Sequence, residues 1–524
     1  MSIPVETTAS VRARLAANDE IALIDLREEG VFAEAHPLFA ASLPFGRIEL
    51  EVLDRLPRKA VPIIVYDFGE GLVEPAHARL RSLGYTNISA LDGGLAGWRR
   101  DGGEIFRDVN TPSKAFGELV ESRRHTPSLS AQEVKALIDS RENVAVLDAR
   151  RFDEYQTMSI PGGISVPGGE LVYRAAAVVP DRDTTIIVNC AGRTRSLIGT
   201  QSLINAGIAN KVFALRNGTI GWSLAGQELE HGQSRRFAED AHADPHTAKN
   251  GRALANRAGV HRLSIDQLSS LLYERGRTTY RFDVRTPAEY AAGHLPGFRS
   301  APGGQLVQET DVFAPVRGAR IILADDTQVR ADMTGSWLAQ MGWEVLVLDE
   351  DIRNLSLETG EWRARRTAFP VVPTLDATEL KQLTDQGRAT VFDLSSSAIY
   401  AKAHIPGAWF ALRSALQNAF ASAPRREITV LTADDDALPR YAAADLRALA
   451  IEAHVLNGGN RAWNEAGYPL ERDIVHYASP PTDRYRRPYE GTDNPVSAMQ
   501  AYLDWEYGLV AQLERDGTHR FHVI

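Results

Sequence analysis

The only cysteine in 524 residues lies in a turn that joins an apolar run to a segment with helical spacing. The sequence reads TTIIVNCAGRTRSLIGTQSLINAG, so Cys190 is followed closely by Gly192, Arg193 and Arg195. Successive backbone N–H groups in such a turn, together with the positive end of the following helix, bind anions. Because these groups and the nearby guanidiniums stabilise a thiolate, we expect Cys190 to be more acidic and more nucleophilic than an ordinary thiol. A buried, inert cysteine is the alternative.

The segment around Cys190 belongs to a unit that occurs four times. Each copy begins with a short strand that ends in an aspartate, and the aligned residues are Asp25, Asp148, Asp283 and Asp393. A turn, a second apolar strand, a helix-patterned segment, a third strand and a Gly-rich turn follow. Apolar strands that alternate with helical segments predict an α/β fold with a mostly parallel central sheet flanked by helices. Ligands bind beyond the carboxyl ends of such strands, where Cys190 lies.

The repeats divide the chain into four expected domains, residues 1–108, 122–232, 257–366 and 370–473, with a C-terminal extension at 474–524. Two segments are expected to be linkers because they lack a clear core pattern, residues 231–259 and 365–373. Residues 496–514 have the pattern of an amphipathic helix, for which Asn494 and Pro495 would supply the cap and first position. We expect this C-terminal helix to dock on a domain or on a partner.

Composition restricts the functions open to the chain. A net charge of −10 argues against a broad surface for nucleic acid or for an acidic membrane. No window approaches the roughly 18 apolar residues of a membrane span, and the N-terminus MSIPVETTASVRARLAANDE lacks the apolar core of a signal peptide. A single cysteine excludes an intrachain disulfide and a cysteine-rich zinc site. We therefore expect no metal and a cytoplasmic, reducing location.

The repeated unit resembles the rhodanese domain. The resemblance is carried by CAGRTR at 190–195, by the Asp-x-Arg after the first strand, by the later Glu-Tyr, by the His-Ile-Pro-Gly or His-Leu-Pro-Gly turn and by the GGLAGW-type ending. It covers almost all of residues 1–473. It implies that Cys190 takes sulfane sulfur from a donor such as thiosulfate, forms a persulfide and passes the sulfur to a thiophilic acceptor. No cofactor is implied beyond this covalent intermediate.

The resemblance also implies roles for the residues that follow the cysteine. The active-site loop would comprise Cys190, Ala191, Gly192, Arg193, Thr194, Arg195 and Ser196. Gly192 would permit a tight backbone path by taking a positive φ. Arg193 would orient the sulfonate end of thiosulfate, and Arg195 would close the loop by bonding its own carbonyl groups. The alternative for each arginine is that it only solvates the domain surface.

Other polar residues near the loop are expected to be structural. Asp148, Arg150 and Glu154 would hold the turn through an Asp–Arg or Arg–Glu pair rather than contact substrate. His294 and His404 occupy the Pro-Gly turns of the third and fourth copies, but the copy with the cysteine has serine at that place. We therefore expect both histidines to have no catalytic role.

Three copies lack the cysteine and are expected to be catalytically silent. Asp67 replaces it in the first copy and Asp325 in the third, and either Ala433 or Asp434 corresponds to it in the fourth. An aspartate cannot form a persulfide, but its carboxylate can mimic a thiolate on the same backbone donors. The first and second copies would form a pair with the site in the crevice between them.

The leading hypothesis is a sulfurtransferase that uses a small anionic donor, thiosulfate or a related persulfide. Mercaptopyruvate-using relatives typically carry a Cys-Gly-Ser-Gly type of loop, which this chain lacks. Since no second cysteine can resolve the persulfide, the acceptor would be external, namely cyanide, glutathione or a protein thiol. A homodimer is a further expectation. The alternatives are a persulfide sensor or scaffold without turnover, and a cysteine phosphatase or arsenate reductase, disfavoured because four residues rather than five separate Cys190 from Arg195.

Overall fold

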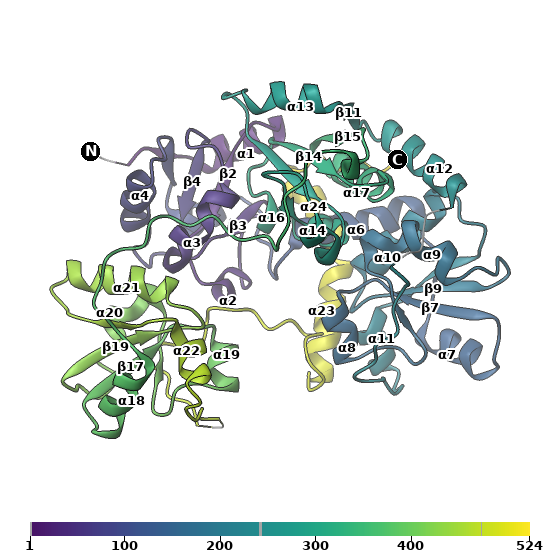
Figure 1. The fold of residues 1–524 in the computed structure, drawn as a ribbon. Coiled ribbons are helices and arrows are strands. Elements are labelled where there is room, and N and C mark those ends of the chain that lie inside the picture. The colour runs from purple at the N-terminus through teal and green to yellow at the C-terminus, as the bar shows by residue number, and fades with distance from the viewer. Residues whose placement is uncertain (1–2, 240–243, 473) are drawn as a thin grey trace.

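A computed structural model describes residues 3–239, 244–472 and 474–524 of the chain (Figure 1). Within these ranges lie four five-stranded sheets, and every recorded strand pairing inside them is parallel. The strand order is the same in each sheet: counted along the chain, first, fifth, fourth, second, third. This confirms the expected α/β class with tandem repeats of one parallel unit.

Each sheet falls within one of the expected domain ranges. The strands of the first sheet are β1 (Val5–Glu6), β2 (Ala22–Asp25), β3 (Ala40–Ser42), β4 (Ile63–Tyr66) and β5 (Ile88–Leu91). Those of the second are β6 (Ser128–Leu129), β7 (Val144–Asp148), β8 (Ile164–Ser165), β9 (Thr185–Asn189) and β10 (Val212–Leu215). Those of the third are β11 (His261–Leu263), β12 (Thr279–Asp283), β13 (Arg299–Ser300), β14 (Arg320–Ala324) and β15 (Glu344–Leu348). Those of the fourth are β16 (Thr374–Leu375), β17 (Ala389–Asp393), β18 (Trp409–Phe410), β19 (Ile428–Thr432) and β20 (His454–Leu456).

Helices flank the sheets and join the domains. The first domain has α1 (Thr8–Ala17), α2 (Glu29–Phe32), η1 (Phe45–Arg47), α3 (Ile48–Arg55), α4 (Val73–Ser82) and α5 (Gly94–Arg100), and α6 (Thr111–Arg124) leads out of it. The second has α7 (Ala131–Asp139), α8 (Phe152–Thr157), η2 (Gly168–Glu170), α9 (Leu171–Val178), α10 (Thr194–Asn205) and α11 (Gly218–Leu224), followed by α12 (Pro245–Arg257). The third has α13 (Ile265–Leu272), α14 (Pro287–Ala292), α15 (Gly303–Gln308), α16 (Thr310–Phe313), α17 (Val329–Gln340) and η3 (Ile352–Asn354). The fourth has α18 (Ala377–Asp385), α19 (Ser397–Lys402), η4 (Arg413–Ala415), α20 (Leu416–Ala419), α21 (Ala437–Ala448) and α22 (Gly459–Glu465), and the extension has α23 (Val496–Tyr507) and α24 (Leu509–Asp516).

The central strands bring the chemically important turns to one edge of each sheet. β9 lies between β7 and β10, and four of its five residues are buried, as its apolar sequence requires. Its register pairs Asn189 with Asp148, the last residue of β7. The carboxyl ends of the two strands therefore meet directly before Cys190. The aspartates that end β2, β12 and β17 have the equivalent register in the other domains.

The segment 231–259 lies between the second and third sheets, as expected of a linker, but part of it forms a helix. Residues 240–243 lie outside the described residues, but α12 begins directly after them, capped by Asp244, whose Oδ2 accepts a hydrogen bond from the Thr247 amide at 3.1 Å. The buried residues of α12 recur with the period of a helix, Thr247, Gly251, Leu254 and Ala255. Most of these residues have small side chains and only Leu254 is large and apolar, so the buried face of the helix is hard to recognise in the sequence. The other expected linker, 365–373, has no helix or strand. The expected domain ends at residues 1 and 473 also lie outside the described residues.

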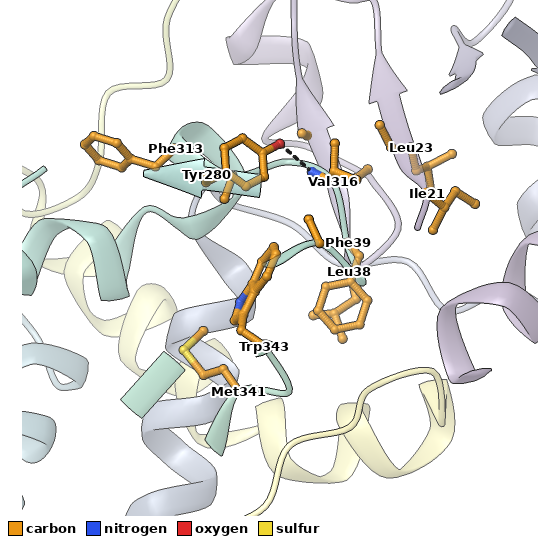
Figure 2. Close-up of a cluster of buried hydrophobic side chains, with 14 of the residues drawn as sticks. Ile21, Leu23, Leu38, Phe39, Tyr280, Phe313, Val316, Met341 and Trp343 are labelled. Atoms are coloured by element: carbon orange, nitrogen blue, oxygen red, sulfur yellow. Dashed lines mark hydrogen bonds between the residues drawn. The ribbon is translucent and has the colours of Figure 1, made fainter. Parts of the chain in front are cut away.

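Domains 1 and 3 share one hydrophobic core, whereas the sequence suggested that the first and second copies form a pair (Figure 2). Figure 2 shows Leu23 and Phe39 of the first domain facing the same cluster as Tyr280 and Trp343 of the third. The Tyr280 hydroxyl accepts a hydrogen bond from the Val316 amide at 3.2 Å. Domains 2 and 3 meet at their Pro-Gly-Gly turns, residues 167–169 and 302–304, whose glycine backbones are in contact.

The C-terminal extension ties the assembly together. The expected single helix is divided at Gly508 into α23 and α24, and both pack on this chain, on α6 among other elements. In Figure 1 the yellow chain runs from the fourth domain across to α23, which lies against the second domain. Pro495 occupies the N-cap without a side-chain bond, and Asn494 instead donates to the Glu490 carbonyl, so the expected cap is wrong.

None of the helices in residues 3–239, 244–472 and 474–524 has both the length and the apolar character needed to cross a membrane.

The glycine contact between domains 2 and 3 makes a testable prediction. A Cβ atom on Gly169 would stand 2.8 Å from the Gly304 amide nitrogen, which is backbone and cannot rotate away. We expect Gly169→Ala to destabilise the assembly by about 1–3 kcal/mol, the usual cost of overpacking, and to lower the midpoint of the first thermal transition. Gly276→Ala is the matched control, because nothing lies within 4 Å of its added methyl group. Equal melting temperatures for the two variants would contradict the contact.

Candidate active site

Cys190 lies at the carboxyl end of β9, directly before α10, and is only 2% exposed. Its Sγ donates to the Ser196 hydroxyl at 3.4 Å, and that hydroxyl donates to the Arg193 carbonyl at 2.8 Å. The first turn of α10 therefore folds back over the sulfur. This brings the expected loop residues Cys190 to Ser196 together around one atom.

The turn between β10 and α11 holds the back of the loop. The amides of Thr219 and Ile220 donate to the carbonyl oxygens of Cys190 and Ala191 at 2.9 and 3.0 Å. Gly218 has a φ of 54°, and a Cβ atom there would stand 2.2 Å from the Cys190 carbonyl oxygen, so this position requires glycine. On the side of the sulfur, the amide of Ser196 is close enough for its hydrogen bond to lower the pKa of the thiol.

The silent copies identify the amides that such a loop offers to an anion. In the first domain the Asp67 carboxylate accepts from the amides of Gly69 at 3.0 Å and Leu72 at 2.7 Å. In the third domain the Asp325 carboxylate accepts from the amides of Asp326 and Arg330, both at 2.8 Å. The expected thiolate-like role of these aspartates is therefore realised in their hydrogen bonds. A donor five positions downstream recurs in both loops.

The fourth domain resolves an ambiguity of the sequence. β19 ends at Thr432, so Ala433 takes the place of the cysteine. Gly459 approaches the Ala433 carbonyl in the way that Gly218 approaches that of Cys190. A methyl group offers neither charge nor nucleophile, so this loop differs both from the cysteine loop and from the two aspartate loops.

The thiol itself is not acidic in this closed site, contrary to the expectation from the sequence. Burial raises the pKa of the Cys190 thiol and outweighs the Arg195 charge and the Ser196 hydrogen bonds, which lower it. The Glu506 carboxyl raises this pKa further. Sequence reasoning recognised the stabilising groups, but it could not supply the cost of burial.

Arg195 lies in the first turn of α10 and pairs with Glu154 of α8. Both Nη atoms donate to the two carboxylate oxygens at 2.8 Å, a bidentate arrangement. Although burial acts in the opposite direction, the charge and hydrogen bonds of Arg195 hold the pKa of Glu154 at about 2. The expected Arg–Glu154 pair is therefore present. Within the described part of the chain, Arg195 makes none of the expected hydrogen bonds to the loop carbonyls. Both of its Nη atoms donate to Glu154 instead.

Asp148 and Arg150 form the second expected pair. Arg150 donates to the Asp148 carboxylate through Nε at 2.9 Å and Nη2 at 2.7 Å, and Nη2 also reaches the Met158 carbonyl at 2.6 Å. Asn189 donates to the same carboxylate at 2.8 Å, which links the pair to the residue before the cysteine. Equivalent Asp–Arg pairs occur in the silent first and third domains. Such repetition supports the expected structural role.

Arg193 has a placement that differs from the expected one. It is 3% exposed and donates to Glu118 of α6 at 2.7 and 2.8 Å, and it also pairs with Glu121. Its guanidinium lies 4.1 Å from the centre of the Tyr507 ring on α23. The two glutamates bind the N–H groups of the guanidinium, and the Tyr507 ring covers one of its faces. The side chain therefore joins the loop to two helices rather than facing a donor.

Gly192 is needed for a different reason from the one expected. Its φ is not positive. A Cβ atom would stand 3.1 Å from a ring carbon of Tyr502 and 3.2 Å from Oε2 of Glu506, both on α23. The C-terminal helix thus lies directly over the loop. Together with α6 it covers the cysteine where the sequence suggested a crevice between the first two domains.

Several residues of the site were missed by the sequence analysis. Glu118, Glu121, Tyr502, Glu506 and Tyr507 are far from Cys190 in the chain and belong to helices outside the repeated unit. The spacing of Glu118 and Glu121 by three residues and of Tyr502 and Glu506 by four was the available signal. It shows which residues share a face, but not which loop that face covers.

The histidines of the Pro-Gly turns have structural partners, as expected. Nδ1 of His294 contacts the Tyr290 carbonyl at 2.9 Å, and Nδ1 of His404 contacts the Tyr400 carbonyl at 2.7 Å. Each imidazole also stacks on the ring of that tyrosine.

A cavity of about 820 Å³ adjoins the outer side of the loop. Residues of all four domains and of the segment 483–491 line it, and Arg150, Glu154 and Arg195 form part of its wall. Its lining contains both arginines and carboxylates. The Arg195–Glu154 pair therefore stands between the cysteine loop and an internal space large enough for small reagents.

Comparison with known proteins agrees with these features. The model of the rhodanese-like domain matches residues 7–101, 130–225, 264–358 and 376–466. The crystal structure of thiosulfate sulfurtransferase from Pseudomonas aeruginosa is 58% identical, with all of both chains covered and a TM-score of 0.95. The 3-mercaptopyruvate sulfurtransferase of Escherichia coli strain K12 is 30% identical over 173 residues, which cover 28% of this chain and 60% of that protein. The thiosulfate sulfurtransferase of Azotobacter vinelandii is 27% identical over 210 residues, 36% of this chain and 76% of that protein.

The match to the E. coli enzyme thus spans less than two thirds of that protein's length. The four segments matched by the family model each lie inside one of the four domains and together make up more than half of the chain. On this evidence the chain belongs to the family of proteins with rhodanese-like domains and carries four of them in tandem.

Proposed function

We propose that the chain is a sulfurtransferase that carries sulfane sulfur on Cys190 from thiosulfate, or a related persulfide donor, to an external thiophilic acceptor. One observation carries the proposal: the same loop position holds a carboxylate in the first and third domains and the cysteine thiol in the second. Asp67 and Asp325 hold carboxylates on loop amides where Cys190 has its sulfur. A loop that binds a carboxylate there is suited to stabilise a thiolate, and then a persulfide anion, at the same place.

The proposed reaction has two displacement steps. The Cys190 thiolate attacks the outer sulfur of thiosulfate, and a new S–S bond forms as that of the donor breaks. The electron pair of the broken bond leaves with sulfite, and the transferred sulfur stays on Cys190 as the terminal atom of a persulfide. A nucleophilic acceptor then attacks this terminal sulfur, and the electron pair of the persulfide bond returns to Cys190 as thiolate.

The residues near the loop support an anionic donor. Arg195 is the cation that lowers the pKa of Cys190, and its pair with Glu154 faces the cavity shared by the four domains. We propose that donor and acceptor approach through this cavity. Thiosulfate is favoured over mercaptopyruvate because the full-length relative with 58% identity is called a thiosulfate sulfurtransferase, and because the loop reads Cys-Ala-Gly-Arg.

The acceptor belongs to the same proposal. Because the chain has one cysteine, its persulfide must be resolved by an outside nucleophile, such as cyanide, glutathione or a protein thiol. A cytoplasmic setting fits a lone reduced cysteine. The absence of a resident cofactor and the possible homodimer stay predictions.

A second candidate is a persulfide store that accepts sulfur without passing it on. The burial of Cys190 under α23 favours it, because an acceptor larger than the cavity cannot reach the sulfur while the helix is in place. The two candidates differ in a single property. A store takes up one sulfur per chain, whereas an enzyme turns over repeatedly in the presence of cyanide or glutathione.

Removing the sulfur atom tests the proposed function directly. We expect Cys190→Ser to abolish thiosulfate:cyanide turnover while the circular dichroism spectrum and melting temperature stay close to wild type, because serine has nearly the same shape. Adding Asp67→Cys to this variant is the matched control, and it should not restore turnover because the loop 67–72 has no arginine. Retained turnover in Cys190→Ser would refute the assignment.

The ion pairs of Arg193 lead to a prediction about stability rather than donor binding. We expect Arg193→Met to cost about 3–5 kcal/mol, because it leaves the buried carboxylate of Glu118 without its partner. Adding Glu118→Gln to the same chain should recover part of the lost stability, as measured by urea unfolding. If Arg193→Met instead raised the KM for thiosulfate at an unchanged melting temperature, the guanidinium would bind the donor after all.

A further inference from the structure

The helix α23 brings a buried carboxyl group over the cysteine loop. Glu506 is 0% exposed, although it belongs to a C-terminal extension more than 300 residues away from Cys190. Its Oε1 accepts a hydrogen bond from the Tyr502 hydroxyl at 2.8 Å. Its Oε2 is buried without a hydrogen-bond partner and lies 3.2 Å from the position of a Cβ atom on Gly192. A free carboxyl oxygen thus points at the turn that cradles the sulfur.

The cations around this carboxyl are bound to other groups. Lys114 of α6 pairs with Asp108 at 2.7 Å, and Arg193 pairs with Glu118 and Glu121. The hydrogen bonds of Glu506 in the described structure therefore come from Tyr502 alone, and a buried carboxylate with one neutral donor is costly. Glu506 Oε2 would be stabilised by carrying a proton, or by accepting a hydrogen bond from a group that arrives with the substrate.

We propose that the Glu506 carboxyl belongs to the sulfur-transfer site and donates a hydrogen bond from Oε2 to the anionic sulfur species that the Cys190 loop holds. This inference rests on the proposed function. Oε1 already accepts from Tyr502, so Oε2 is the oxygen left to carry the proton. A neutral carboxylic acid solvates a thiolate, a persulfide or a sulfonate, whereas a carboxylate at the same place repels each of them.

The charge state of Glu506 follows from all the elements packed around it. Burial and the Glu118 carboxylate raise its pKa to about 8, against the lowering effects of Lys114, the Tyr502 hydroxyl and Arg193. The other titratable or charged groups near the site are Cys190 and Arg195 of the loop, Glu121 of α6, Asp108, Tyr489 of the extension and Tyr507 of α23. At neutral pH the acid is therefore protonated, as the proposal requires.

The proposal gives the reaction two opposing pH dependences. Loss of the Cys190 proton creates the nucleophile, so activity rises with pH through the thiol titration. Loss of the Glu506 proton removes the hydrogen-bond donor and adds a negative charge, so activity falls as the carboxyl titrates. The wild-type profile of kcat/KM for thiosulfate should be bell-shaped, and its two apparent pKa values belong to the coupled pair of groups.

The test is the pH profile of Glu506→Gln, which keeps the shape and a hydrogen-bond donor but does not titrate. We expect the alkaline limb, a fall of about tenfold per pH unit in the wild type, to disappear, so that kcat/KM rises to a plateau. Asp504→Asn on the exposed face of α23 is the control, with a wild-type profile expected. Tyr502→Phe is the second variant. Because its hydroxyl lowers the pKa of Glu506, its removal should move the alkaline limb to higher pH.

The outcomes separate the two proposals. If wild-type protein takes up no sulfur from thiosulfate at any pH, the proposed function fails whatever Glu506 does. If wild-type protein turns over but the profiles of Glu506→Gln and Tyr502→Phe superimpose on it, only the role of Glu506 is refuted. Should Glu506→Gln fail to fold, an unshifted alkaline limb in Tyr502→Phe is sufficient to overturn the inference.

Discussion

The sulfur of Cys190 is buried at the end of β9, so any negative charge that it takes in the proposed reaction must be compensated, and the rest of the site depends on this requirement. The parallel register brings Asp148 and Asn189 together, and the turn at Gly218 holds the carbonyls of the loop away from the sulfur. The groups that favour a charge on the sulfur are the hydroxyl and amide of Ser196 and the charge of Arg195. The silent loops solve the same problem with a permanent carboxylate, which accepts from the amides that a sulfur anion would use only during the reaction. The same loop thus holds a carboxylate in two domains and the cysteine in a third.

The four domains form one molecule around that loop. Arg193 connects it to α6 through two carboxylates and to α23 through the Tyr507 ring, and α23 arrives by way of the fourth domain. The third domain buries its own loop in a charge network, in which Arg330 pairs with Asp325 and with Glu170 of the second domain. The silent domains can therefore contribute by enclosing the cysteine and its adjoining cavity, without any chemistry of their own.

The fold and the place of the cysteine loop could be predicted from the sequence because their signals are local, and those of the fold are also repeated. Apolar strands that end in aspartate, the spacing of Cys190 from Arg195, and the pairs that Asp148 and Glu154 form all lie within one repeat. The errors concern contacts between distant segments. Gly192 seemed to serve a positive φ, whereas the side chains of Tyr502 and Glu506 crowd the place that a Cβ atom would take. The Cys190 pKa seemed low because amides and arginines are visible in the sequence, whereas burial by a distant helix is not. The helix α12 was overlooked because its buried face is made mostly of small residues.

The central claim, that Cys190 carries sulfur between two outside reagents, is tested most directly by intact-protein mass spectrometry of the full chain. The protein is treated with thiosulfate, mapped by proteolysis without reductant, and then exposed to cyanide or glutathione. The account predicts a gain of one sulfur atom, located on Cys190 and lost again when the acceptor is added. No gain of mass in a protein whose thiol still reacts with an alkylating reagent, or a gain that the acceptor does not remove, would contradict it.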